Sequence, residues 1–165
     1  MHLSRRCFLS GLSLTLTTVM LACAQLSFAA ATLHGRVVHV IDGDSLILLV
    51  GDRRFTIRLA QIDAPGHRQA YGIASRQSLS SLCGGELAQA NVGGKDRNGR
   101  LVAHVTCAGI DANAEQVRRG MAWVFDRYAP AHSLLYRVQE DARTARRGLW
   151  AQAKPLPPWE WQHSK

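Results

Sequence analysis

Hydrophobic and polar positions near the start of the chain follow the pattern of three short strands. Residues 33–41 are rich in β-branched side chains and residues 45–50 are apolar, with the turn Asp42-Gly43-Asp44 between them. After a second turn, a third segment is apolar at every second position, with Phe55, Ile57 and Leu59 on one face. Three strands joined by tight turns predict the start of an antiparallel barrel or sandwich.

The middle of the chain predicts one helix and two further strands. Pro65-Gly66 ends the preceding extended segment, and residues from about 69 to 82 have the apolar spacing of a helix. Residues 86–92 and 101–107 are typical of strands, and Asn98-Gly99 between them is a strong hairpin signal. This segment therefore brings the number of predicted strands to five.

Two helices and a proline-rich tail are predicted for the last third of the chain. Asn113 followed by Gln116 has the spacing of a capping box at the start of a short helix, and residues 121–125 are apolar enough to be buried. A last helix is predicted over residues 133–147, with an apolar stripe of Leu134, Leu135, Val138, Ala142 and Ala145. The prolines of the tail argue against a helix there, so we expect an extended segment whose tryptophans pack on the domain.

Five strands with peripheral helices, in this order, match the small Greek-key barrel called the OB-fold. The sequence therefore predicts an α+β protein built on a five-stranded β-barrel, because a sandwich would need more strands. We expect one folded domain over residues 32–150, followed by a Pro/Trp-rich tail over residues 151–165. No internal repeat or second domain is visible in the sequence.

The first 31 residues have the pattern of an export signal. Arg5-Arg6 precedes a long uncharged run, and Ala29-Ala30-Ala31 fits a cleavage site before Thr32. The arginine pair also resembles the twin-arginine export signal, which predicts a periplasmic or extracellular protein. Two alternatives stay open, namely an uncleaved membrane anchor and a lipid attached at Cys23.

Loss of this segment would leave two cysteines, Cys83 and Cys107. In an oxidising compartment such a pair forms a disulfide more often than not, so we expect a bond between them. The alternative is two buried thiols. The chain has no CxxC motif and no closely spaced Cys and His residues, which argues against a zinc site.

The chain is basic, and most of its positive charge is carried by arginine. Lys and Arg number 20 against 12 Asp and Glu, which gives a net charge of +8 at pH 7. A basic balance favours polyanionic partners, and the planar guanidinium suits phosphate better than an ammonium does. The alternative explanation is an ordinary surface that happens to be rich in arginine.

Two acidic turns and two arginines are candidates for a metal-assisted phosphate site. Asp44 and Asp63 follow neighbouring predicted strands, and paired carboxylates with a backbone carbonyl suit Ca²⁺, with Mg²⁺ or Mn²⁺ as alternatives. Arg58 lies within a strand and Arg100 follows the hairpin. Each residue has an ordinary explanation as a turn or surface residue. Together, two guanidiniums and a cation would neutralise a phosphodiester.

Several motifs in register make the chain similar to the staphylococcal nuclease-like (thermonuclease) family. They are Val40-Ile41-Asp42-Gly43-Asp44-Ser45, Ile57-Arg58-Leu59, Ile62-Asp63-Ala64-Pro65, Gln69-Ala70-Tyr71-Gly72, Asp96-Arg97-Asn98-Gly99-Arg100, Gly120-Met121-Ala122-Trp123 and Ala145-Arg146-Arg147-Gly148-Leu149-Trp150. The tail Pro158-Trp159-Glu160-Trp161 also resembles that of exported bacterial members. The resemblance implies an OB-fold and calcium-dependent cleavage of DNA and RNA. We expect the substrate to be single-stranded or fraying nucleic acid.

The resemblance also implies a role for each matching residue. Asp44 and Asp63 match the calcium-binding carboxylates, the Ala64 carbonyl matches a further ligand, and Asp42 matches an acidic neighbour. Arg58 and Arg100 match the arginines that hold the scissile phosphate. Arg97 stands where a phosphate-contacting lysine is common, and Asn98 replaces an aromatic residue.

Gly66 departs from the family pattern Asp-Ala-Pro-Glu, whose glutamate is assigned the role of general base. Because glycine accepts no proton, we expect slow hydrolysis by an exported calcium-dependent nuclease. His67 is a substitute base to be tested. The alternative is an inactive OB-fold module that binds single-stranded nucleic acid, and a weaker option is a structural or protein-binding barrel in the cell envelope. We expect a monomer that meets the membrane only through its N-terminal segment.

Overall fold

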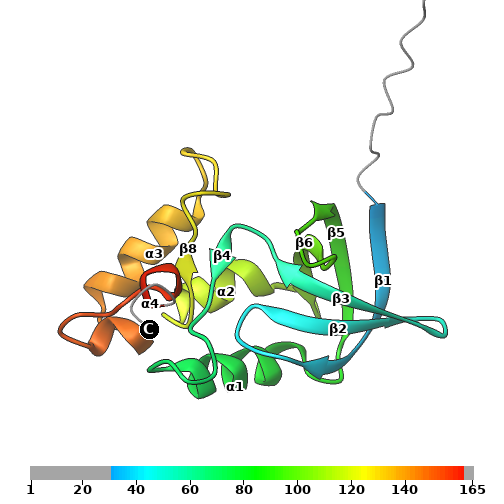
Figure 1. Cartoon of the computed structure of the whole chain (residues 1–165), viewed down its shortest axis with the longest axis horizontal. Helices are drawn as coiled ribbons and strands as arrows, with labels where there is room; N and C mark the ends of the chain where they lie inside the picture. Colours follow the sequence, from blue (N-terminus) through cyan, green and yellow to red (C-terminus); the bar gives the residue numbers. More distant parts are fainter. Residues whose placement is uncertain (1–30, 162–165) are drawn as a thin grey trace, which may run out of the picture.

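Five strands form a closed β-barrel in the computed structural model, which describes residues 31–161 (Figure 1). The strands are β1 (Ala31–Val40), β2 (Ser45–Val50), β3 (Arg53–Leu59), β5 (Leu87–Lys95) and β6 (Leu101–Cys107). Antiparallel pairs give the order β3-β2-β1-β5-β6, and a parallel pairing of β3 with β6 closes the barrel. The predicted five-stranded OB-fold with peripheral helices is confirmed.

Side chains along β2 and β3 alternate between the two faces of each strand. The apolar ones fill the barrel, and the functional ones point the other way. Leu46 and Leu48 of β2 and Ile57 and Leu59 of β3 are buried, and Leu46 pairs with Ile57 across the two strands. Each such side chain contributes about 1.5–3 kcal/mol to stability when it is fully buried. Because neighbours along a strand point to opposite faces, Arg58 faces away from this core.

The remaining elements surround the barrel. Within residues 31–161 they are β4 (Ile62–Asp63), α1 (Gly72–Cys83), β7 (Ile110–Asp111), α2 (Ala112–Arg118), β8 (Trp123–Val124), α3 (Leu135–Thr144), the 3₁₀-helix η1 (Gly148–Ala151) and α4 (Pro158–Trp161). The short strand β4 leads into α1 and pairs with β8, the strand that precedes α3 (Figure 1). Asp44 lies in the turn before β2, whereas Asp63 belongs to β4 itself, at the start of the segment predicted as the second acidic turn.

A disulfide joins the end of α1 to the end of β6. It connects Cys83 and Cys107, which are both buried in the core. The predicted pairing is therefore present, and it ties the one helix between β4 and β5 to the barrel wall.

The start of α2 differs from the prediction. Asp111 is the N-cap residue, and its carboxylate accepts a hydrogen bond of 3.0 Å from the Ala114 amide. Asn113 is buried instead: its Oδ1 accepts from the Val105 amide and its Nδ2 donates to the Ala60 carbonyl, both at 2.9 Å. The predicted capping box is wrong because this amide pairs buried backbone groups where β3 and β6 meet.

The C-terminal part also differs from the prediction. The helix α3 is shorter than expected, and Leu134, which was placed in its apolar stripe, is 73% exposed. The tail contains the short helix α4, which begins with Pro158 at a position where a missing amide hydrogen costs no hydrogen bond. Trp159 of α4 stacks on Phe125 with ring centroids 5.1 Å apart, so the prediction that the tail packs on the domain is confirmed.

The predicted export signal lies outside the described residues, apart from Ala31 at the start of β1. The same holds for Cys23, the predicted lipidation site. Across residues 31–161 no helix combines the length and the apolar character needed to cross a membrane. Export, anchoring and lipidation therefore stay predictions.

Candidate active site

The turn between β1 and β2 is held in place by its own backbone and by two helices. The Asp42 carboxylate accepts a hydrogen bond of 3.0 Å from the Asp44 amide. The Gly43 carbonyl accepts one of 2.7 Å from Nε2 of Gln116 in α2. A Cβ atom at Gly43 would overlap the Ser75 hydroxyl of α1, so only glycine allows this close approach. The turn therefore presents Asp44 in a fixed position.

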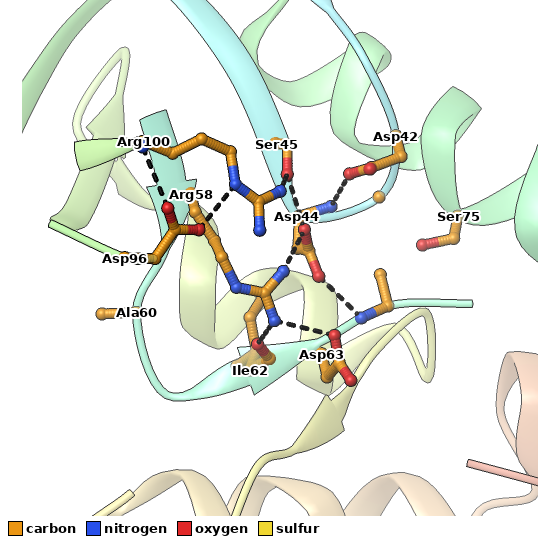
Figure 2. Close-up of polar contacts among 12 residues, drawn as sticks. Asp42, Asp44, Ser45, Arg58, Ala60, Ile62, Asp63, Ser75, Asp96 and Arg100 are labelled. Atoms are coloured by element: carbon orange, nitrogen blue, oxygen red, sulfur yellow. Dashed lines mark hydrogen bonds and ion pairs between the residues drawn. The ribbon is translucent and has the colours of Figure 1, made fainter. Parts of the chain in front are cut away.

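Asp44 is the centre of the polar cluster in Figure 2 and is only 3% exposed. Its Oδ1 accepts from the Ser45 hydroxyl and from Nη1 of Arg58, both at 2.8 Å. Its Oδ2 accepts from the Ala64 amide at 2.9 Å, which ties the first acidic turn to the second. One carboxylate thus connects β2, β3 and the segment after β4.

Arg58 bridges the two acidic turns. Besides its bond to Asp44, its Nη2 donates to Asp63 Oδ1 at 2.7 Å and to the Ile62 carbonyl at 3.3 Å (Figure 2). These contacts fix a guanidinium that is largely buried against the end of the barrel. The structure therefore brings together Asp44, Asp63 and Arg58 as the sequence predicts.

Arg100 reaches the same place from the hairpin between β5 and β6. Its Nη1 donates to the Ser45 hydroxyl at 3.1 Å, and its Nε donates to Asp96 Oδ2 at 2.7 Å. Asp96 also accepts from the backbone amides of Asn98 and Arg100, both at 2.9 Å, so one carboxylate shapes the turn and aims the guanidinium. Both arginines thereby contact the Asp44-Ser45 pair (Figure 2).

The cluster carries an excess of buried negative charge. Burial first, and then repulsion from Asp44, raises the pKa of Asp42 and that of Asp63 from 3.8 to about 6. Burial alone would lower the pKa of Arg58, but the ion pairs with Asp44 and Asp63 outweigh it and raise this pKa above its usual range. Arg58 is therefore permanently charged, and one guanidinium does not fully offset three carboxylates.

The donor set fits a hard divalent cation, although the carboxylates do not form a complete cage. Among the described residues, no group of three or more Asp, Glu, His or Cys side chains is arranged to hold a metal ion. Asp44 and Asp63 with the Ala64 carbonyl would supply the protein ligands, and water or substrate oxygens would complete the shell. Repulsion from Asp44 is the second cause, after burial, of the raised pKa values of Asp42 and Asp63, and a cation at these carboxylates would relieve that repulsion.

A groove of about 920 Å³ runs over this cluster. Five of the predicted site residues line it, namely Arg58, Asp63, Arg97, Asn98 and Arg100. Asp44 is buried and does not line the groove, so any substrate in the groove would lie over Asp63 and the two arginines. Arg97 and Asn98 are exposed on the hairpin rim. The groove therefore combines these positive side chains with the carboxylates of Asp63 and Asp96.

Gly66 and His67 lie beside the cluster without adding a proton acceptor to the groove. Neither residue lines the groove; His67 is exposed and lines a separate surface hollow of about 620 Å³. This position argues against His67 as the substitute base. A Cβ atom at Gly66 would have one neighbour within 4 Å, the Trp161 ring at 3.9 Å, so a longer side chain at this position starts without a clash.

Sequence reasoning missed the residues that hold the site together. Gln116 donates to the first acidic turn, Ser75 packs against Gly43 of that turn, and Asp96 orients Arg100. Gln116 is fully buried and also accepts a hydrogen bond of 2.6 Å from the Ser78 hydroxyl. The available signal for this role is a polar residue, Gln116, on an otherwise apolar helix face, but its spacing from Asn113 predicts a helix cap instead.

Residues 56–152 match the model of the family described as staphylococcal nuclease homologue. The chain belongs to this family. The matched range includes Arg58, Asp63 and Arg100, and it ends before the tail helix α4.

Similar family proteins are described as nucleases. An uncharacterized endonuclease of Escherichia coli O157:H7 is 40% identical over 136 residues, which cover 82% of this chain and 88% of that protein. An uncharacterized endonuclease of Haemophilus influenzae is 35% identical over 165 residues, covering 99% of this chain and 88% of that protein. The micrococcal nuclease of Shigella flexneri is 34% identical over 147 residues, covering 82% and 84% of the two chains.

Proposed function

We propose that this protein is an exported nuclease that hydrolyses phosphodiester bonds of DNA or RNA in a calcium-dependent reaction. The observation that carries the proposal is that Arg58 and Arg100, which both line one groove, converge on the buried Asp44-Ser45 pair. Membership of a family with endonuclease and micrococcal nuclease relatives supports a nucleic-acid substrate. Export is proposed from the twin-arginine-like N-terminal segment.

The two arginines would bind the phosphate that is cleaved. Arg58 has two nitrogens engaged with Asp44 and Asp63, and a phosphate would compete with these carboxylates for the same guanidinium. Arg100 is held by Asp96 and is directed at Ser45, so it would reach the phosphate from the hairpin between β5 and β6. Both charges would act most strongly as negative charge accumulates on phosphorus in the transition state.

Hydrolysis adds a water oxygen to phosphorus and breaks the bond to the leaving sugar oxygen, which takes up a proton. A Ca²⁺ ion at Asp44, Asp63 and the Ala64 carbonyl would supply positive charge that polarises a phosphoryl oxygen. Glycine at position 66 provides no group to take the proton from the attacking water. Because general-base catalysis contributes about 10²- to 10⁴-fold, we expect a slow enzyme whose charge stabilisation is intact.

The second candidate function is binding of single-stranded nucleic acid without cleavage. Gly66 is the observation that favours it, since a binding protein needs no general base. Two carboxylates placed beside the phosphate-binding arginines argue against it, because they would repel a nucleic acid unless a cation offset them.

A cleavage assay with three proteins separates the two functions. Purified wild type, Gly66→Glu and Gly66→Gln would be incubated with heat-denatured DNA in calcium or in chelator. The nuclease proposal predicts slow calcium-dependent cleavage by the wild type and faster cleavage by Gly66→Glu. It predicts no gain with Gly66→Gln, because the glutamine side chain is as large as that of glutamate but has no carboxylate. A wild type that binds DNA but never cuts it, with a Gly66→Glu variant that does, would assign the natural protein to the binding class.

A further inference from the structure

The C-terminal tail is hydrogen-bonded, through Gln69, to the segment that follows Asp63. Gln69, which is buried, donates from Nε2 to the Leu156 carbonyl at 2.6 Å, and its Oε1 accepts from the Gly66 amide at 3.4 Å. Two residues farther along the tail, Pro158 is buried at the start of α4. The tail is therefore a fixed part of the fold next to the second acidic turn, although it lies beyond the range that matches the family model.

This fastening places Trp159 in the wall of the substrate groove. Trp159 stacks on Phe125 with an angle of 15° between the rings, and Phe125 in turn meets Tyr128 edge to face at 5.1 Å. All three aromatic residues line the groove that contains Arg58 and Arg100. Trp161, on the same short helix, does not line it.

The groove thus has two chemically different sides. The hairpin side carries Lys95, Arg97 and Arg100 beside Asp96, whereas the side that follows β8 and includes the tail carries all three aromatic rings beside Arg127. A single nucleic-acid strand has the same asymmetry, with phosphates along one edge and flat apolar bases along the other. Bases in a duplex are already stacked and paired, so only a single strand offers a base to a protein ring.

We propose that Trp159 is a base-stacking residue of the substrate groove, which packs against a nucleobase next to the phosphate held by Arg58 and Arg100. The proposal rests on the proposed function, since it deepens that site by naming single-stranded nucleic acid as its substrate. Stacking of one base on an aromatic side chain is worth about 1–3 kcal/mol, which corresponds to about 5- to 150-fold in affinity.

Binding without cleavage tests this role directly. The full chain would be titrated in calcium, at times shorter than those at which it cleaves the strand, against labelled oligodeoxythymidylate and against an abasic strand of the same length and charge. Fluorescence anisotropy then gives the two dissociation constants. Trp159→Ala is expected to weaken binding of oligodeoxythymidylate by about 5- to 150-fold and to change binding of the abasic strand less than about twofold.

Three further variants separate stacking from a general effect on the fold. Trp159→Phe, which retains a ring, is expected to keep most of the base-dependent affinity. Trp159→Leu, which keeps apolar volume against Phe125, is expected to lose it. Trp161→Ala, on the same helix but outside the groove, is expected to bind both strands like the wild type, and thermal unfolding would be recorded for every variant.

The binding measurements test the stacking role separately from the nuclease activity that the cleavage assay tests. Equal losses for both strands, no loss for oligodeoxythymidylate, or the same base-selective loss in Trp161→Ala would overturn the stacking role of Trp159. A protein that never cleaves DNA but shows the base-selective loss in Trp159→Ala would retain the stacking role and refute the nuclease proposal alone.

Discussion

Replacing Asp42 by Asn removes one charge from the acidic cluster while preserving its hydrogen-bond geometry. The Asp42 carboxylate accepts the Asp44 amide at 3.0 Å, and the carbonyl oxygen of asparagine can accept the same bond. The carboxylates of Asp42 and Asp44 repel each other, and this repulsion costs stability when both are ionised. We therefore expect the Asp42→Asn protein to be more stable than the wild type near neutral pH when no divalent cation is present.

The size and sign of the effect follow from the pKa of Asp42. Burial and repulsion from Asp44 raise it from 3.8 to about 6, so the folded protein binds this proton more tightly than the unfolded chain does. Stability of the wild type therefore falls as the pH rises from about 4 to about 6, and the variant lacks this contribution. Because each pKa unit corresponds to about 1.4 kcal/mol, the gain in free energy of unfolding is at most about 3 kcal/mol above pH 6.

Urea unfolding of both proteins in chelator, from pH 3.5 to pH 8, measures this difference. The account predicts little difference at the acidic end and a gain of about 1–3 kcal/mol at neutral pH. Asp52→Asn, an exposed aspartate in the turn after β2, is the matched control and should show no such trend. A variant that is less stable than the wild type at neutral pH, or a difference that does not depend on pH, would refute the reasoning about excess buried charge.

Three other predictions concern the groups that support the site. Reduction of the Cys83–Cys107 disulfide, or Cys83→Ala, should lower the free energy of unfolding by about 2–5 kcal/mol, measured by urea unfolding with and without reductant; equal stability would contradict a native bond. Gln116→Leu should leave the Gly43 carbonyl without its partner and cost about 1–3 kcal/mol in the same measurement, unlike Gln77→Leu on exposed α1 surface. Arg100→Lys should slow cleavage more than it weakens DNA binding, because an ammonium keeps the charge but cannot contact Asp96 and Ser45 as the guanidinium does; an unchanged single-turnover rate would remove Arg100 from the proposed catalytic role.

Local patterns in the sequence are sufficient to predict the barrel strands and the acidic turns. The alternation of Phe55, Ile57 and Leu59 marks the buried face of β3 and therefore directs Arg58 away from it. Asn98-Gly99 predicts the hairpin, where Gly99 has a positive φ of 80°. In both cases neighbouring residues alone determine the backbone shape.

Long-range contacts explain what the sequence could not predict. Asn113 and Gln116 have the spacing of a capping box, but their amides pair with Ala60 and Gly43, which are distant in sequence. The helix α4 was missed because its four residues are stabilised by packing of Trp159 on Phe125 rather than by their own propensity. The parallel closure of β3 on β6 has no local signal of any kind.

The calcium-dependent cleavage rate of the Asp44→Asn protein tests the central claim most directly, because Asp44 connects Arg58, Ser45 and the second acidic turn. Single-turnover cleavage of a labelled single-stranded oligonucleotide would be compared in wild type, Asp44→Asn and the exposed control Asp52→Asn, each checked for folding by circular dichroism. The account predicts that Asp44→Asn falls to the rate seen in chelator while Asp52→Asn cleaves like the wild type. A folded Asp44→Asn protein that cleaves at the wild-type rate in calcium would contradict the account.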